Sequence, residues 1–308
     1  SVSLSKLGEV QLAAGDLVGA RTSFAESVQI ALRIAADNLS SAKAQRNVAA
    51  SLSRFGYVQR AVGDLAGARA SAEGGLQITQ RLAADNPFSA KAWRDLSISY
   101  GELGDVQQAV GDLAGARASY AESLQIGRRL AADNPSSAEA RRDVSISLNK
   151  LGNLQEAAGD LAGARASYAE SLQIARRLAA DNPSSAEVRR DVAVSLIKLG
   201  DVQQAAGDLA GARASYAESH RILQRLAADN PSSAQARRDV SVSLDKLGEV
   251  QQTAGDLAGA RASYAESLQI GRRLAADNPS SAAARRDIAA SLIKLGDVQQ
   301  AAGDLAGA

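Results

Sequence analysis

The chain has 308 residues, of which 45% are hydrophobic but only 3% aromatic, and its 35 lysines and arginines nearly balance its 34 aspartates and glutamates. A chain so close to neutral offers no single-sign field for nucleic acid or an anionic membrane, so neither is an expected partner. Cysteine is absent, which excludes disulfides and thiolate chemistry and fits a reducing, cytoplasmic compartment.

A Gly-Asp-Leu motif recurs along the chain at a constant spacing of 48 residues. Its glycines are Gly15, Gly63, Gly111, Gly159, Gly207, Gly255 and Gly303. A strict period in this range is typical of stacked supersecondary repeats, none of which can bury its apolar face alone. We therefore expect one solenoid over residues 1–308, with about six and a half repeats, cut inside a repeat at both ends.

One repeat, residues 135–182, contains two stretches in which apolar residues return every three or four positions, the spacing of one helical face. Each stretch predicts a helix of about 20 residues. Between them, Gly159 can take the left-handed conformation that ends the first helix, and Asp160 can cap the second. Because this turn is tight, the two helices must run antiparallel. The second helix should end near Asp181, ahead of Pro183. Ser184 or Ser185 can then cap the next first helix.

These residues resemble the tetratricopeptide repeat, whose signature is W-x2-L-G-x2-Y, then A-x3-F, then P. The signature falls on Leu148, Leu151, Gly152 and Gln155, then Ala164 and Tyr168, then Pro183. The small residues and the aromatic match, whereas Leu148 replaces tryptophan and Gln155 replaces tyrosine. The repeat is longer than the common 34-residue one by about two turns in each helix, so it looks like a long-helix variant, as in bacterial multidomain proteins.

The resemblance implies an all-α solenoid of antiparallel helix pairs stacked into a right-handed superhelix. It also implies that the first helix of each pair lines a concave surface that binds a protein or peptide. A HEAT or armadillo solenoid, whose repeat lengths are closer to 48 residues, is the alternative.

The second repeat departs from the others. Ala72 stands where other repeats carry tyrosine, and Gly74 and Gly75 interrupt the second helix. Aromatic residues occur here at positions that are not aromatic elsewhere, namely Phe88 and Trp93, with Phe55 in place of a leucine. Each glycine costs a helix about 1 kcal/mol relative to alanine, so we expect local softness, with the aromatics filling the lost tyrosine volume. A hinge, a ligand pocket and relaxed drift are the alternatives.

Positions that differ between repeats are candidates for recognition, because stacking requires the repeated ones. On the first helix, the positions of Glu139, Ile146, Asn149, Asn153 and Glu156 form one stripe at steps of seven, three, four and three. The expected apolar anchors on it are Ile197 and Ile293, and the expected polar contacts are Asn149, Asn153, Asp201, Asp245 and Glu249. Neutral drift on a solvated face explains the same variation.

Four arginines, Arg142, Arg190, Arg238 and Arg286, flank this stripe. A guanidinium can bind a partner's carboxylate through paired hydrogen bonds. The alternative is a surface ion pair with a glutamate three residues earlier, such as Glu139 or Glu187.

His220, the single histidine, stands where other repeats carry leucine. No cysteine or carboxylate cluster accompanies it, so it predicts a repacked helix rather than a metal site. The sequence contains no nucleophile-base set, phosphate loop or dinucleotide motif, and we expect neither an enzyme nor a cofactor. The prediction is a non-enzymatic scaffold that binds a protein or peptide within a larger multidomain protein. The alternative is a structural array that self-associates through uncapped ends into a filament.

Overall fold

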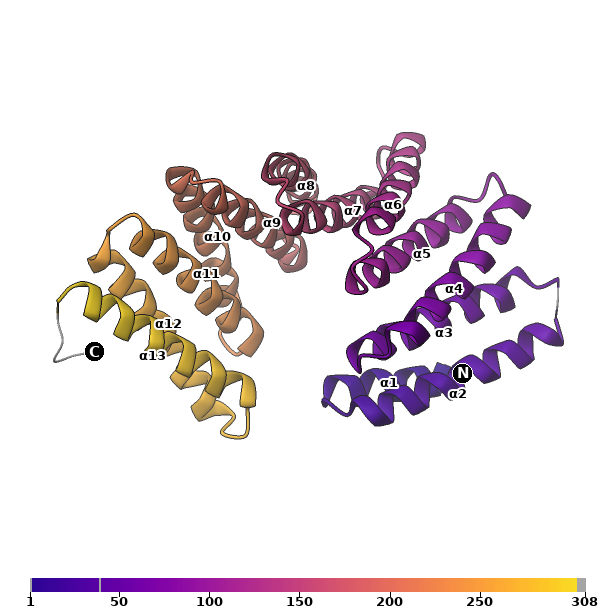
Figure 1. The fold of residues 1–308 in the computed structure, drawn as a ribbon, viewed down its shortest axis with the longest axis horizontal. Helices are drawn as coiled ribbons and strands as arrows, with labels where there is room; N and C mark the ends of the chain where they lie inside the picture. Colours follow the sequence, from indigo (N-terminus) through magenta and orange to yellow (C-terminus); the bar gives the residue numbers. More distant parts are fainter. Residues whose placement is uncertain (1, 39, 304–308) are drawn as a thin grey trace. The chain divides into compact units, whose positions relative to one another are not determined.

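The computed structural model describes residues 2–38 and 40–303, and within these ranges it contains thirteen α-helices and no strand (Figure 1). The first helices of the pairs are α1 (Val2–Ala13), α3 (Ala42–Ala61), α5 (Ala90–Ala109), α7 (Ala138–Ala157), α9 (Ala186–Ala205), α11 (Ala234–Thr253) and α13 (Ala282–Ala301). The second helices are α2 (Leu17–Ala36), α4 (Leu65–Asp85), α6 (Leu113–Asp133), α8 (Leu161–Asp181), α10 (Leu209–Asp229) and α12 (Leu257–Asp277). The helix expected to open after Asp304 lies outside the described residues.

The turns within the pairs have the predicted chemistry. All seven motif glycines have φ between 79° and 82°, a left-handed conformation that favours glycine. The aspartate after the glycine caps the second helix, as where Asp112 accepts a hydrogen bond of 2.9 Å from the Gly115 amide. Between pairs, the second serine of the two candidates is the cap: Ser185 accepts from the Val188 amide at 3.3 Å.

Helix contacts divide the chain into two compact units, residues 1–158 and residues 159–308, called unit 1 and unit 2 below. Within each unit, every helix packs against the next helix along the chain. First helices also contact the first helix of the following pair, as α3 does with α5 and α9 does with α11. Each unit is therefore an all-α repeat solenoid in which the first helices share one face.

A tyrosine and a glycine set the distance between the helices of a pair. Tyr120 on α6 is buried, and a Cβ atom on Gly104 of α5 would lie 2.5 Å from its ring. The pairs Gly200–Tyr216 and Gly248–Tyr264 give the same 2.5 Å. No side chain fits between such a glycine and the ring, which explains the glycine in the repeats that carry this tyrosine.

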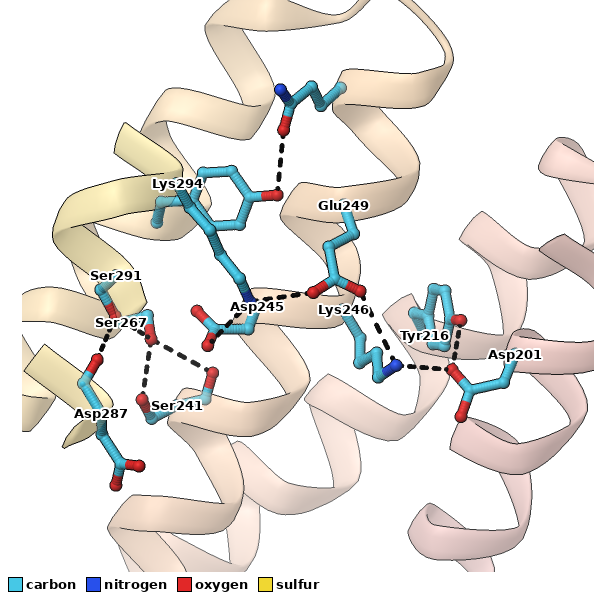
Figure 2. Close-up of polar contacts among 12 residues, drawn as sticks. Asp201, Tyr216, Ser241, Asp245, Lys246, Glu249, Ser267, Asp287, Ser291 and Lys294 are labelled. Atoms are coloured by element: carbon cyan, nitrogen blue, oxygen red, sulfur yellow. Dashed lines mark hydrogen bonds and ion pairs between the residues drawn. The ribbon is translucent and has the colours of Figure 1, made fainter. Parts of the chain in front are cut away.

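Buried serines form a second repeated contact, shown for unit 2 in Figure 2. Ser241 Oγ and Ser267 Oγ lie 2.7 Å apart, and Ser267 Oγ and Ser291 Oγ lie 3.3 Å apart. Ser291 also donates to the Asp287 carbonyl at 3.1 Å. Small hydroxyl side chains thus allow close helix packing while their hydrogen-bonding groups stay satisfied.

His220 lies half-buried on α10, with Nδ1 3.0 Å from Ser243 Oγ on α11. Burial lowers the pKa of His220, and the negative charge of Glu266, which raises it, has the smaller effect. This contact with a neighbouring helix accords with the repacked position expected from the sequence.

Candidate functional site

The predicted stripe of unit 2 carries a network of ion pairs between repeats (Figure 2). Lys246 Nζ lies 3.0 Å from Asp201 Oδ1 and 3.7 Å from Glu249 Oε2. Lys294 Nζ lies 2.8 Å from Glu249 Oε1 and 3.3 Å from Asp245 Oδ2. The three acidic residues predicted as partner contacts are therefore brought together by lysines of the same chain.

The surroundings of these lysines favour their charged form. Burial lowers the pKa of Lys246, but the carboxylates of Asp201 and Glu249 more than offset it, so the pKa is raised. The same balance, with Glu249 and Asp245 as the carboxylates, raises the pKa of Lys294. Cation and acid lie 45 residues apart in each main pair, which makes the network a feature of stacking. A partner would have to compete with it for these acids.

The two isoleucines predicted as anchors have different environments. Ile197 is partly buried and packs against clusters that include Leu223 of α10 and Val250 of α11. Ile293 on α13 is 66% exposed. The structure thus gives Ile197 a packing role between neighbouring repeats, and a role as an exposed anchor stays a prediction for Ile293.

The flanking arginines bind aspartates of the next repeat. Arg190 donates to Asp239 through Nε at 2.5 Å and through Nη2 at 3.1 Å, and the hydrogen bonding raises its pKa. Arg238 Nε lies 3.1 Å from Asp287 Oδ2. Arg46 and Arg94 of unit 1 bind Asp95 and Asp143 in the same way. The alternative from the sequence placed the partner three residues earlier, whereas the partner found for Arg190 and Arg238 lies in the following repeat.

The remaining predicted residues, Arg142, Asn149 and Asn153, are half-buried on α7 of unit 1. Asn149 Oδ1 is buried and accepts no hydrogen bond from the described part of the chain. Their role in recognition stays a prediction.

The first-helix face of unit 1 contains a groove of about 540 Å³. Its lining comes mainly from α3, α5 and α7. Apolar side chains include Leu52, Ile98, Val106 and Ile146, and Ala72 contributes from α4. Ile98 and Ile146 are 43% and 47% exposed, so they present apolar surface to a ligand. A volume of this size lies within the roughly 300–1,000 Å³ typical of ligand pockets.

Ala72, which stands where other repeats carry tyrosine, lines the groove. Phe55 packs against the cluster of Phe24 and Val58, Phe88 is fully exposed, and Trp93 donates to the Pro87 carbonyl at 2.9 Å. These three aromatics were expected to fill the space, and the structure places them elsewhere. The structure contains a groove at this repeat, and a role for it as a ligand pocket stays a prediction, beside a hinge and relaxed drift.

Most charged groups that line the groove are paired. Arg54 Nε lies 3.1 Å from Glu9 Oε1, and Arg94 binds Asp143 at 2.5 Å. Asp105 takes two cations, with Lys150 Nζ at 2.8 Å and Arg60 Nη1 at 3.4 Å. The cations of the groove are thus already neutralised by carboxylates of unit 1.

Glu102, on α5, is the exception among the described carboxylates of the groove. Its partner is the neutral hydroxyl of Ser53, which donates to Oε1. Burial raises the pKa of Glu102, and the charge of Asp105 adds to this, so that together they outweigh the Ser53 hydrogen bond and the charges of Lys150 and Arg54, which lower it. The groove therefore contains one half-buried carboxylate that has a neutral hydroxyl, and no cation, as its described partner.

Sequence reasoning missed both features of this groove. The branched aliphatics Ile98, Ile146, Val194 and Val242 are exposed at one repeated position, which lies on the predicted stripe but was not among its expected apolar anchors. Glu102 was detectable, because the equivalent position is Lys6, Arg54, Lys150, Lys198, Lys246 and Lys294 in the other repeats. A charge reversal at an otherwise basic position was the available signal.

Residues 2–38 and 40–303 contain neither a metal-binding cluster nor a membrane-spanning helix. No group of three or more acidic or histidine side chains in these ranges is arranged to hold a metal ion. None of the helices there combines the length and apolar character needed to cross a bilayer.

Comparison with known families identifies the repeat. Family models described as tetratricopeptide repeat match residues 144–184, and residues 1–26 and 193–218. A comparison with curated proteins gave no match.

Solved structures share the fold. BtubC (BKLC) from P. vanneervenii superposes with a TM-score of 0.66 at 22% identity, over 84% of this chain and 91% of that one. A STAND protein with a tetratricopeptide repeat sensor from Pyrococcus horikoshii gives a TM-score of 0.56 at 13% identity, over 98% of this chain and 42% of that one. The nearly identical TPR-like repeats of a putative kinesin light chain of Podosopora anserina give 0.51 at 18% identity, over 75% of this chain and 96% of that one. The chain therefore contains tetratricopeptide repeats, matched at residues 1–26, 144–184 and 193–218, in a fold that it shares with these solved structures.

Proposed function

We propose that this chain is a non-enzymatic protein-interaction scaffold that binds an extended peptide segment of its partner on the first-helix face, in the groove of unit 1. The observation that carries this proposal is the groove of about 540 Å³, in which exposed Ile98 and Ile146 lie among paired charges. Apolar walls with a few fixed polar groups are what a peptide-binding surface requires. The tetratricopeptide repeat sensor of the Pyrococcus horikoshii protein supports a recognition role for such an array.

The test is selection from a random peptide library displayed on phage, followed by measurement of Kd for synthetic copies of the enriched peptides. The groove variant carries Ile98→Glu and Ile146→Glu. Its matched control carries Leu32→Glu and Ile34→Glu on α2, two aliphatics of 50% and 45% exposure that lie outside the groove. Because all four side chains are partly exposed, both variants are expected to fold, which circular dichroism checks.

Peptides should bind the native chain and the control equally. They should bind the groove variant about tenfold or more weakly, because the new glutamates replace apolar contacts and would be buried beneath the peptide. Equal binding to the groove variant would place recognition elsewhere on the chain. Light scattering over a range of concentrations accompanies the assay, since a particle mass that grows with concentration would instead favour the self-assembling array.

A further inference from the structure

Several residues at which the second and third repeats differ from other repeats line the groove of unit 1. Five of its lining residues are Tyr57, Arg60, Ala72, Gly101 and Glu102. At the equivalent positions of the fifth repeat the residues are Asp201, Gln204, Tyr216, Ile197 and Lys198. These five changes lie together in one groove, although other changes of the second repeat, such as Gly74 and Phe88, lie outside it.

Two of these changes create the space. In the third repeat, Tyr120 is buried and its hydroxyl donates to Asp105 at 2.8 Å and to Gln108 at 3.1 Å. The residues equivalent to that aspartate and glutamine in the second repeat are Tyr57 and Arg60, which line the groove. Ala72 therefore leaves open the volume that a tyrosine ring would occupy. Gly101 removes a further side chain from the same groove.

The other changes set its charge. In other repeats, a lysine on the first helix pairs with an acid 45 residues earlier in the sequence. Lys150 pairs with Asp105 in this way, and Lys246 with Asp201. At the equivalent pair of positions, Glu102 corresponds to the lysine and Tyr57 to the acid. No lysine or arginine stands at this pair of positions, because the residue at the lysine position is Glu102.

A cation on a ligand would supply the positively charged partner that the Glu102 carboxylate lacks in unit 1. Glu102 is half-buried and its described partner is the neutral hydroxyl of Ser53, which is unfavourable for a carboxylate with no cation in contact. Its raised pKa points the same way, with burial as the main cause and the charge of Asp105 adding to it. Lys150 and Arg54 are held by Asp105 and Glu9, at 2.8 Å and 3.1 Å. An ammonium or guanidinium group brought in by a ligand would pair with the carboxylate without displacing either contact.

We infer that the groove of unit 1 receives a lysine or arginine side chain of the bound peptide, and that Glu102 is its ion-pair partner. The aliphatic part of such a side chain lies along Ile98 and the floor at Ala72, and its charged end reaches Glu102. This inference rests on the peptide-binding function proposed above and assigns the specificity of that site.

The experiment uses the full chain and the same random peptide library, and it compares four proteins. Beside the native chain they are Glu102→Gln, which keeps an acceptor for Ser53, Glu102→Lys, which restores the basic residue of the other repeats, and Ala72→Tyr, which restores their tyrosine. All three replacements introduce residues that suit the repeat or its local contact, so folding should be retained, and circular dichroism checks it.

The native chain should enrich peptides that share a lysine or arginine at one position. Glu102→Gln should weaken their binding about tenfold or more, and replacing that cation in the peptide by norleucine should make the native and Glu102→Gln proteins bind alike. Glu102→Lys should lose the preference for a basic residue, and Ala72→Tyr should lose binding.

Three results would overturn the inference. Enriched peptides with no shared basic residue would leave the proposed function standing and remove the role of Glu102. A shared basic residue whose contribution is unchanged by Glu102→Gln would assign it to another acid. Failure of the native chain to enrich any peptide would contradict the proposed function itself, and this inference with it.

Discussion

The carboxyl group of Glu102 is held in an environment that disfavours its charge, and the consequence is a dependence of stability on pH. Burial raises its pKa in the folded chain above the ordinary value of the unfolded one. The folded state therefore binds more protons than the unfolded state between these two values. This contribution to stability is fully present below the ordinary pKa and is lost as the pH rises through the folded pKa.

We predict that Glu102→Gln raises the free energy of unfolding at about pH 7 and leaves it unchanged at about pH 3, because the neutral amide avoids the cost of a buried charge. Urea unfolding of both proteins at the two pH values measures this. Ser53 can still donate to the amide oxygen of the variant, so the measured difference does not include the loss of that hydrogen bond. A variant less stable than the native chain at neutral pH would show that Lys150 and Arg54 compensate the charge after all.

The two isoleucines of the predicted stripe provide a second test at this scale. Ile197→Glu should destabilise the chain by about 2–4 kcal/mol, since it places a charge among the apolar side chains around Leu223 and Val250. Ile293→Glu is the matched control and should change stability by less than about 0.5 kcal/mol, because that side chain is 66% exposed. Equal effects in chemical denaturation would contradict the packing role assigned to Ile197.

At the scale of the helix, α4 is the element whose sequence fits its structure least well. It keeps a full 21-residue helix although Gly74 and Gly75 lie within it and Ala72 replaces a core tyrosine. A Cβ atom at Gly74 would come no nearer than 3.5 Å to another atom, and one at Gly75 no nearer than 3.8 Å. Neither glycine is needed for close packing, so both only weaken the helix.

Gly74→Ala and Gly75→Ala should therefore each stabilise the chain by about 0.5–1 kcal/mol, as expected for removal of a glycine from a helix interior. The control is Gly104→Ala, because its Cβ would lie 2.5 Å from the Tyr120 ring and should destabilise the chain. Thermal unfolding of the three variants distinguishes the cases. Destabilisation by alanine at position 74 or 75 would indicate a contact that the glycines serve.

At the scale of the whole molecule, a repeat array is held together by contacts between neighbours, so a weak repeat is not rescued by a distant core. This applies inside unit 1, where α4 has the two unneeded glycines and α6, one repeat later, has the full sequence with Tyr120. Stability should therefore vary from repeat to repeat.

We predict faster amide hydrogen exchange in α4 than in α6, measured by mass spectrometry on peptides of the intact chain. In a variant with Ala72→Tyr, Gly74→Ala and Gly75→Ala the difference should disappear, because these changes restore packing volume and helix propensity. Protection of α4 equal to that of α6 in the native chain would show that its neighbours compensate for the weak sequence.

The sequence by itself determined the helices, their turns and the repeat family. The glycine of each Gly-Asp turn, the aspartate and serine caps and the apolar spacing act over a few residues, so they can be recognised along the chain. The 48-residue period repeats each of these local signals along the chain, so the repeats support one another's assignment. The tyrosine and glycine that approach within a pair were recognisable for the same reason, since the glycine recurs in every repeat and the tyrosine in most of them.

Only the tertiary structure decided which variable residues are free to meet a partner. Asp201, Asp245 and Glu249 look exposed on a helical stripe, but lysines about one repeat later in the sequence bind them. Ile197 looks like an anchor but packs against the next helix pair. Whether a side chain is already paired depends on residues more than 40 positions away, which the period of a single helix does not reveal. The groove follows the same logic, because the loss of one tyrosine opens a space only where the surrounding helices leave it unfilled.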